Sequence, residues 1–180
     1  MNRTLILYKS QTGFTQKYAQ WAADDLACAL APWGRSPMRG YHTIVFGTRA
    51  HAGRADGLKQ ALSAYEKSGA QRLVLFVTGA MPNAAQETIQ QFWEQNLTQE
   101  QRAAIPHFYF QAGLCYERMG FLDRAMMKGL ARFLDHKADK TPEEAEMQKA
   151  IAASYDISDR ALLKPMLELL RESTWPMGSK

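Results

Sequence analysis

Cysteine pairs, long hydrophobic runs and a targeting segment are all absent from this sequence. The two cysteines, Cys28 and Cys115, do not form a CxxC pair, which leaves no redox or zinc motif of that kind. The longest apolar run, Leu73–Val77, is far shorter than the roughly 20 residues that a membrane span needs. The N-terminal residues lead directly into Thr4–Tyr8 without the hydrophobic region of a secretory signal. We therefore expect a cytoplasmic protein with free thiols and no transmembrane segment.

Clustered charge is also scarce. The 180 residues are 46% hydrophobic and 22% charged, a balance that excludes a disordered chain. The net charge of +4 is uneven, because residues 1–80 hold ten Lys or Arg against four Asp or Glu. This positive half can attract an anionic ligand. It contains no Lys/Arg run and no basic stripe interleaved with aromatics, so we expect no nucleic-acid partner. The histidines lack the spacing of metal ligands, so we expect no metal site.

Apolar runs alternate with amphipathic segments along most of the chain. The runs are continuous, which is typical of parallel strands buried on both faces and covered by helices. We predict strands at Thr4–Tyr8, Thr43–Phe46, Arg72–Val77 and His107–Phe110, and a weaker one at Cys28–Pro32. We predict helices at Gln16–Ala27, Asp56–Ser68, Asn83–Asn96 and Leu122–Leu134, and loops at Thr48–Arg54 and Gln111–Gly120. Asp56 is the expected N-cap of the second helix, and Gly69 is expected just beyond its end.

The last 45 residues have a different pattern. A polar linker, His136–Lys140, precedes Thr141–Glu144, which has the form of a capping box with Pro142 at the first helical position. One helix is expected from there to about Ser154, and a second, amphipathic helix over Asp159–Glu172. We therefore predict a domain over residues 1–135 and a helical extension over residues 136–180 that packs on the same domain.

The segment between the first strand and the first helix carries the strongest chemical signal. Ser10–Thr15 combines a glycine, Gly13, with the hydroxyls of Ser10, Thr12 and Thr15 at a helix N-terminus. Free N–H groups and the helix dipole make such a turn suited to a phosphate. It has neither the GK[ST] ending of a nucleoside triphosphatase nor a GxGxxG pattern. The alternative is an ordinary helix start with Thr12 or Thr15 as N-cap.

Three segments together carry a resemblance to a known family. The pattern S-x-T-G-x-T of Ser10–Thr15 resembles the phosphate loop of flavodoxins, which bind the monophosphate of FMN without Lys or Arg. Tyr41–Gly47 is similar to the third strand of that fold. Ala112–Lys128, with its Tyr, D-R and Met pair in that order, resembles the flavodoxin-like protoporphyrinogen dehydrogenases and their relatives. The similarity covers residues 4–134.

This resemblance implies a flavodoxin-like three-layer α/β sandwich with a five-stranded parallel sheet in the order 2-1-3-4-5. FMN would bind beyond the carboxyl ends of the strands. Its phosphate would lie on the Ser10–Thr15 loop. Its isoalloxazine ring would lie between the loops Thr48–Gly53 and Thr78–Met81, with Gly113–Tyr116 as a third wall. The implied cofactor-binding residues are Ser10, Gln11, Thr12, Gly13, Phe14, Thr15, Thr48, Arg49, Ala50, His51, Ala52, Gly53, Thr78, Gly79, Ala80, Met81, Gly113 and Tyr116.

Two positions of the implied ring site carry charge or replace an aromatic. Arg49 would place a cation beside the pyrimidine edge of the flavin, or be a solvated loop arginine. Ala52 stands where relatives often carry an aromatic, so His51 or Tyr116 is expected to stack on the ring in its place. His51 is also a candidate proton donor near N5 of the flavin.

The resemblance implies electron transfer, with the flavin performing the chemistry and the protein tuning it. The electrons would pass to a redox partner protein or a small-molecule donor or acceptor, and a homodimer is left open. An FMN-dependent oxidoreductase is the enzymatic version, although the long insertion of the protoporphyrinogen dehydrogenases is missing at Met81–Asn83. The alternative is a non-redox interaction module that has lost FMN and uses its last helix as the contact.

Overall fold

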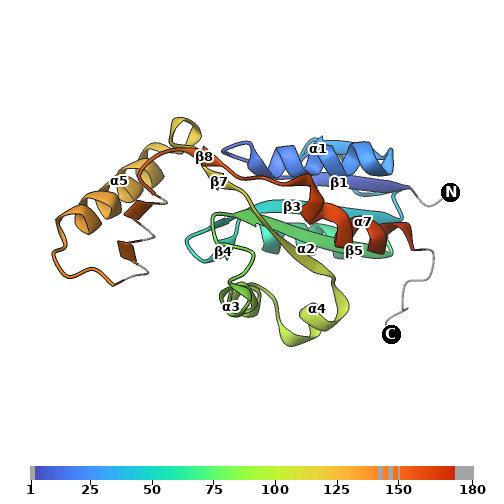
Figure 1. Cartoon of the computed structure of the whole chain (residues 1–180). Helices are drawn as coiled ribbons and strands as arrows, with labels where there is room; N and C mark the ends of the chain where they lie inside the picture. The colour runs from blue at the N-terminus through green and yellow to red at the C-terminus, as the bar shows by residue number, and fades with distance from the viewer. Residues whose placement is uncertain (1–2, 142–143, 146–147, 150, 173–180) are drawn as a thin grey trace.

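The computed structural model describes residues 3–141, 144–145, 148–149 and 151–172. Its centre is a parallel sheet flanked by helices on both faces (Figure 1). The five parallel strands are β1 (Thr4–Tyr8), β2 (Ala29–Pro32), β3 (Thr43–His51), β5 (Arg72–Gly79) and β6 (His107–Gln111). The helices of the sandwich are α1 (Phe14–Leu26), α2 (Leu58–Glu66), α3 (Gln86–Asn96), α4 (Gln99–Ala104) and α7 (Lys164–Arg171).

The spatial order of the strands is β2-β1-β3-β5-β6. When only the five parallel strands are numbered along the chain, this is the order 2-1-3-4-5, so the predicted topology is confirmed. β1 pairs with β3 from Thr4↔Thr43 to Tyr8↔Gly47. The carboxyl end of β1 therefore lies beside Gly47, near the carboxyl end of β3. In a sheet of this order the chain crosses from one side to the other between β1 and β3, and that switch point lies above the carboxyl ends.

Side-chain alternation divides the core into two layers. Leu5 and Leu7 of β1 face a cluster that contains Leu58 of α2 and Phe92 of α3. Ile6, between them, faces the opposite cluster, formed with residues of α1 and α7. Because both faces are covered, the central strands are apolar along their length and not only at every second residue. That is why continuous apolar runs predicted them correctly.

The loop predicted at residues 48–54 is wrong. β3 continues to His51 and turns back as the short strand β4 (Arg54–Ala55), with Ala50 opposite Ala55. The two turn residues, Ala52 and Gly53, have φ of +47° and +75°, the left-handed geometry of a tight two-residue hairpin. The polar and small residues of this hairpin hide it from an apolar-run search, and its position fixes Arg49 and His51 on a strand.

Several helix boundaries also differ from those predicted. Helix α2 begins at Leu58 and its N-cap is Gly57, with φ +75° and no side-chain cap, so Asp56 is not the cap. Helix α3 begins at Gln86, after a turn, and not at Asn83. The chain then forms α4, which was not predicted and begins with a capping box between Thr98 and Gln101.

After β6 the chain leaves the sandwich. The predicted loop contains β7 (Gly113–Leu114), which pairs antiparallel with β8 (Tyr155–Asp156), and a 3-10 helix η1 (Tyr116–Arg118). Helix α5 (Phe121–His136) follows and projects beyond the carboxyl ends of the sheet (Figure 1). Leu134 packs on Leu114 and Ile151 in a small third cluster. Other positions of α5 expose large apolar side chains: Phe121, Leu122, Met126, Leu130 and Phe133.

The last helix returns to the sandwich. The predicted segment is a 3-10 helix η2 (Arg160–Leu163) that leads into α7, and Asp159 caps it by accepting a hydrogen bond from Ala161 N. Leu163 and Met166 are fully buried against α1 and the sheet. This face is therefore already occupied within the chain, and it is not free to serve as the contact of an interaction module.

Near residue 141 the predicted capping box is present. Thr141 N donates to Glu144 Oε2 and Glu144 N donates to Thr141 Oγ1. Pro142 and part of the helix expected up to Ser154 lie outside the described residues. Among the helices within the described ranges, none is both long and apolar enough to cross a membrane.

Candidate functional site

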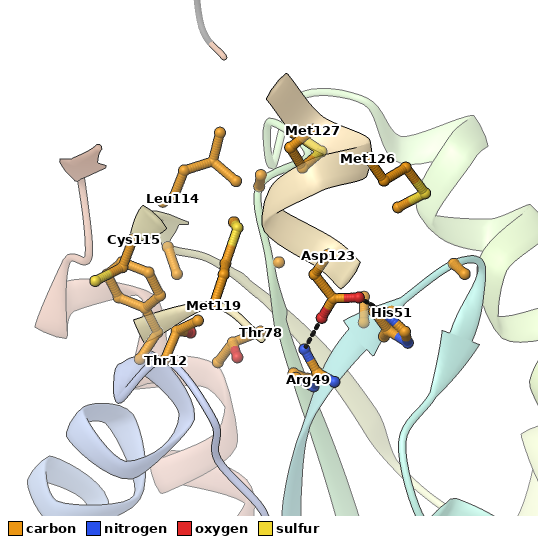
Figure 2. Close-up of a pocket in the computed structure, with 17 residues that line it drawn as sticks. Thr12, Arg49, His51, Thr78, Leu114, Cys115, Met119, Asp123, Met126 and Met127 are labelled. Carbon is orange, nitrogen blue, oxygen red and sulfur yellow. Dashed lines mark hydrogen bonds and ion pairs between the residues drawn. The ribbon is translucent and has the colours of Figure 1, made fainter. Parts of the chain in front are cut away.

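A cavity of about 200 Å³ lies at the carboxyl ends of the strands, between the β3–β4 hairpin, the end of β5, β7 and the start of α5 (Figure 2). Its wall is mostly apolar, with one cluster of charged side chains on one side. The lining residues are Thr12, Phe14, Arg49, Ala50, His51, Ala52, Thr78, Gly79, Ala80, Ala112, Gly113, Leu114, Cys115, Met119, Asp123, Met126 and Met127.

The Ser10–Thr15 loop forms the N-terminal end of α1 beside this cavity. Gly13 is the N-cap of the helix, with φ +96°, and no side chain caps the helix start. The first intrahelical bond runs from Lys17 N to Gly13 O, so the N–H groups of the preceding turn have no partner within the helix. The alternative of a start capped by Thr12 or Thr15 is therefore wrong. Ser10 Oγ accepts a hydrogen bond from Gly13 N at 3.1 Å, which leaves its own proton available to a ligand.

Thr15 is turned away from the loop and into the sandwich. Its hydroxyl lies 2.8 Å from the hydroxyl of Thr78 at the end of β5, and both side chains are buried. Thr78 Oγ1 also lies 3.5 Å from Thr48 O. Thr48 Oγ1 in turn donates to Asp56 O. These hydroxyls join α1, β5 and β3 below the cavity and fix the position of the loop.

A second, wider cavity of about 620 Å³ adjoins the first one. The two cavities share four wall residues: Thr12, Phe14, Leu114 and Cys115. Gly13 and Arg118 line only the second cavity. The space therefore runs from the free N–H groups at the start of α1 to the hairpin that carries Arg49 and His51.

Asp123, at the start of α5, contacts Arg49 and His51 of the β3–β4 hairpin (Figure 2). Its Oδ1 lies 2.8 Å from His51 Nε2, and its Oδ2 lies 3.4 Å from Arg49 Nη1. A carboxylate can only accept, so His51 carries its proton on Nε2 in this contact. The hydrogen bond from His51, reinforced by Arg49, holds the pKa of the Asp123 carboxyl below its ordinary value. The cluster fastens α5 to the hairpin across the cavity.

Arg49 is held on its other side by Asp56. Arg49 Nε lies 3.5 Å from Asp56 Oδ2, and Lys9 Nζ donates to Asp56 Oδ1 at 2.8 Å. Burial favours the protonated form of Asp56, but Lys9 and Arg49 outweigh it and hold the pKa of this carboxyl below its ordinary value. With only 19% of its side chain exposed, Arg49 is not a solvated loop arginine.

The predicted site residues are largely brought together. Ten of them line the first cavity: Thr12, Phe14, Arg49, Ala50, His51, Ala52, Thr78, Gly79, Ala80 and Gly113. Gly53 and Met81 line a neighbouring pocket on the far side of the hairpin. Gln11 lies against Gly120. Tyr116 lines none of these three pockets, and its hydroxyl donates to Ile151 O at 2.5 Å; of the two candidates for stacking, only His51 lies at the cavity.

Leu114 and Cys115 belong to the predicted third wall, and five further residues of the cavity wall were not predicted: Ala112, Met119, Asp123, Met126 and Met127. All of them lie in the Ala112–Lys128 segment. The resemblance to the protoporphyrinogen dehydrogenases rests on this same segment, so a signal was present. It marked the segment as distinctive without indicating that the start of α5 folds over the strand ends.

Comparison with known proteins gives one family. A family model described as the flavodoxin domain matches residues 5–141. A WrbA-like flavodoxin from Agrobacterium tumefaciens is 15% identical, with 61% of this chain and 83% of that chain covered and a TM-score of 0.40. A flavoprotein in complex with FMN from Lactobacillus acidophilus is 17% identical, with 62% and 93% covered and a TM-score of 0.44. The search of curated proteins found no match.

Proposed function

The chain belongs to the flavodoxin domain family, and from this membership we propose that it binds FMN and acts in electron transfer. The phosphate of FMN binds at the Ser10–Thr15 loop, and the isoalloxazine ring occupies the cavity between the β3–β4 hairpin, the end of β5 and α5. When bound, FMN supplies reversible transfer of one or two electrons.

The observation that carries this proposal is the uncapped start of α1. A glycine with φ +96° forms the N-cap, and no side chain satisfies the N–H groups that follow it. Unsatisfied N–H groups and the positive end of the helix dipole favour an anion at that point. Ser10 is in place to add a hydroxyl donor, because its oxygen already accepts from Gly13 N. The residues present therefore fit the terminal phosphate of FMN.

The rest of the cavity suits a flat, largely apolar ring. Gly79 and Ala80 at the end of β5, and Leu114 and Met119 beyond β6, line it with small or apolar groups, which would exclude water from a bound ring. Arg49 stands on one side with His51 beside it and brings a positive charge to the cavity, which Asp56 and Asp123 offset in part. Positive charge beside a flavin favours its reduced, anionic form.

The enzymatic version of the proposal is an FMN-dependent oxidoreductase similar to the protoporphyrinogen dehydrogenases. The Ala112–Lys128 segment supports it, because that segment supplies a whole wall of the cavity. A redox partner protein or a small molecule would exchange electrons with the bound flavin. Oxidation of protoporphyrinogen by the FMN-loaded protein tests this version, and its absence would leave an electron carrier.

The central proposal is tested by flavin binding. Purified protein, stripped of any cofactor, is titrated with FMN and followed by calorimetry and flavin fluorescence. We expect saturable binding, a yellow protein after excess FMN is washed away, and reversible bleaching of the visible band on anaerobic reduction. A colourless protein with no heat of FMN binding would contradict the proposal and favour a non-redox interaction module.

A further inference from the structure

Arg118, at the end of η1, lies directly against the phosphate loop. A methyl group placed on Gly13 would come within 2.7 Å of Arg118 Nη1. The same segment touches the loop a second time, because a methyl group on Gly120 would lie 3.0 Å from Gln11 Nε2. The segment between β7 and α5 therefore covers the start of α1 at two points, and the guanidinium is the charged group at the first of them.

This guanidinium has no carboxylate partner within the described ranges of the chain. Two carboxylates line the same cavity as Arg118, but each is engaged elsewhere. Glu117 Oε2 accepts a hydrogen bond from Ser154 Oγ at 2.7 Å. Asp156 Oδ2 accepts one from Lys17 Nζ at 2.7 Å. The cation beside Gly13 is therefore not neutralised by these two groups.

We propose that Arg118 is a phosphate-binding residue of this chain, which contacts the terminal phosphate of FMN from the side opposite the N–H groups of α1. The inference rests on the proposed FMN site and adds a residue to it. A planar guanidinium binds phosphate oxygens through two parallel hydrogen bonds. A phosphate monoester carries about −1.5 to −2 charges near neutral pH, more than the half charge of a helix N-terminus offsets.

This assignment departs from the phosphate loop that the sequence resembles. The S-x-T-G-x-T pattern implies that backbone N–H groups and hydroxyls hold the phosphate without Lys or Arg. Here a cation from a segment more than 100 positions away completes the cradle. The functional consequence is selectivity, because riboflavin has the same ring but no phosphate and gains nothing from Arg118.

The test measures FMN and riboflavin binding by calorimetry for the wild-type chain and the variants Arg118→Ala, Arg118→Lys and Arg132→Ala. Arg132 is an exposed arginine on α5, so its replacement makes the same change in net charge away from the loop. Loss of a charge-assisted hydrogen bond predicts an FMN affinity about tenfold or more lower in Arg118→Ala. The riboflavin affinity of Arg118→Ala should stay unchanged. The FMN affinity of Arg118→Lys should lie between those of the wild type and Arg118→Ala, and that of Arg132→Ala should match the wild type.

A repeat at higher ionic strength sharpens the test, because added salt screens an exposed cation. The preference of the wild type for FMN over riboflavin should fall with salt more steeply than that of Arg118→Ala. An unchanged FMN-to-riboflavin ratio in Arg118→Ala would overturn the assignment. Equal loss of both ligands would also overturn it, because it would mean a structural role. If the wild type binds riboflavin and FMN equally, Arg118 has no phosphate contact. If it binds neither, the proposed function fails and the assignment with it.

Discussion

The buried hydroxyl pair of Thr15 and Thr78 gives the sharpest test of how the loop is built. The two oxygens lie 2.8 Å apart, and the two residues are 1% and 3% exposed. Replacing either threonine by valine keeps the shape and leaves one buried hydroxyl without its partner, which costs about 1–3 kcal/mol. The Thr78 hydroxyl keeps a second contact to Thr48 O at 3.5 Å, whereas the Thr15 hydroxyl has no other hydrogen bond within the described residues. Thr78→Val should therefore cost more than Thr15→Val.

The assay is denaturant unfolding of the two single variants and of the double variant, read as a double-mutant cycle. Because the double variant leaves no unpaired hydroxyl, its loss of stability should be smaller than the sum of the two, with a coupling of about 0.5–3 kcal/mol. FMN affinity should be unchanged in Thr15→Val, since this hydroxyl is committed to Thr78. Additive losses would refute the hydrogen bond. A fall in FMN affinity would mean that Thr15 serves the phosphate, as the sequence alone suggested.

Two further predictions concern the loop and the charged cluster. Gly13→Val should abolish FMN retention with an unchanged far-ultraviolet dichroism spectrum, because a Cβ at φ +96° meets Arg118. The control is Gly40→Val, at φ +87° with nothing within 4 Å, which should keep FMN. Equal FMN retention by both variants would contradict this role for the loop. Because His51 lowers the pKa of Asp123, their contact should stabilise the fold above the ordinary carboxyl pKa. This stabilisation should be lost as Asp123 is protonated, below about pH 4. In urea unfolding, the stability difference between the wild type and Asp123→Asn should therefore be smaller at pH 3 than at pH 7, and a constant difference would contradict the prediction.

The sheet could be predicted because its strands are buried on both faces. Continuous apolar runs such as Leu73–Val77 need no alternation, and they identified the core of each central strand. Two strands were predicted to end too early, since β5 continues to Gly79 and β3 to His51. The last residues of these strands are polar or small and lie at the site, so the apolar run ends before the strand does. The order of the strands came from a resemblance and not from periodicity.

The hairpin at the end of β3 shows why local patterns fail at the site. Its residues are short, small or charged, and neither strand propensity nor alternation singles them out. The signal that could have found it is the turn, where Ala52 and Gly53 both adopt positive φ. A glycine after a small residue is only a weak form of the preferred Asn-Gly turn. The pairing of Ala50 with Ala55 and of His51 with Arg54 in the structure is what identifies the hairpin.

The charged side of the cavity depends on contacts that no stretch of sequence contains. Whether Arg49 is a solvated loop residue or a cation held beside a cofactor depends on Asp123, which lies 74 positions further along the chain. Asp123 reaches it only because α5 begins above the strand ends instead of continuing the sandwich. The same departure of the chain carries Arg118 over Gly13. One change of direction after β6 therefore sets both the charge balance beside the ring cavity and the cation at the phosphate loop, so these two properties should respond together to any substitution that displaces the start of α5.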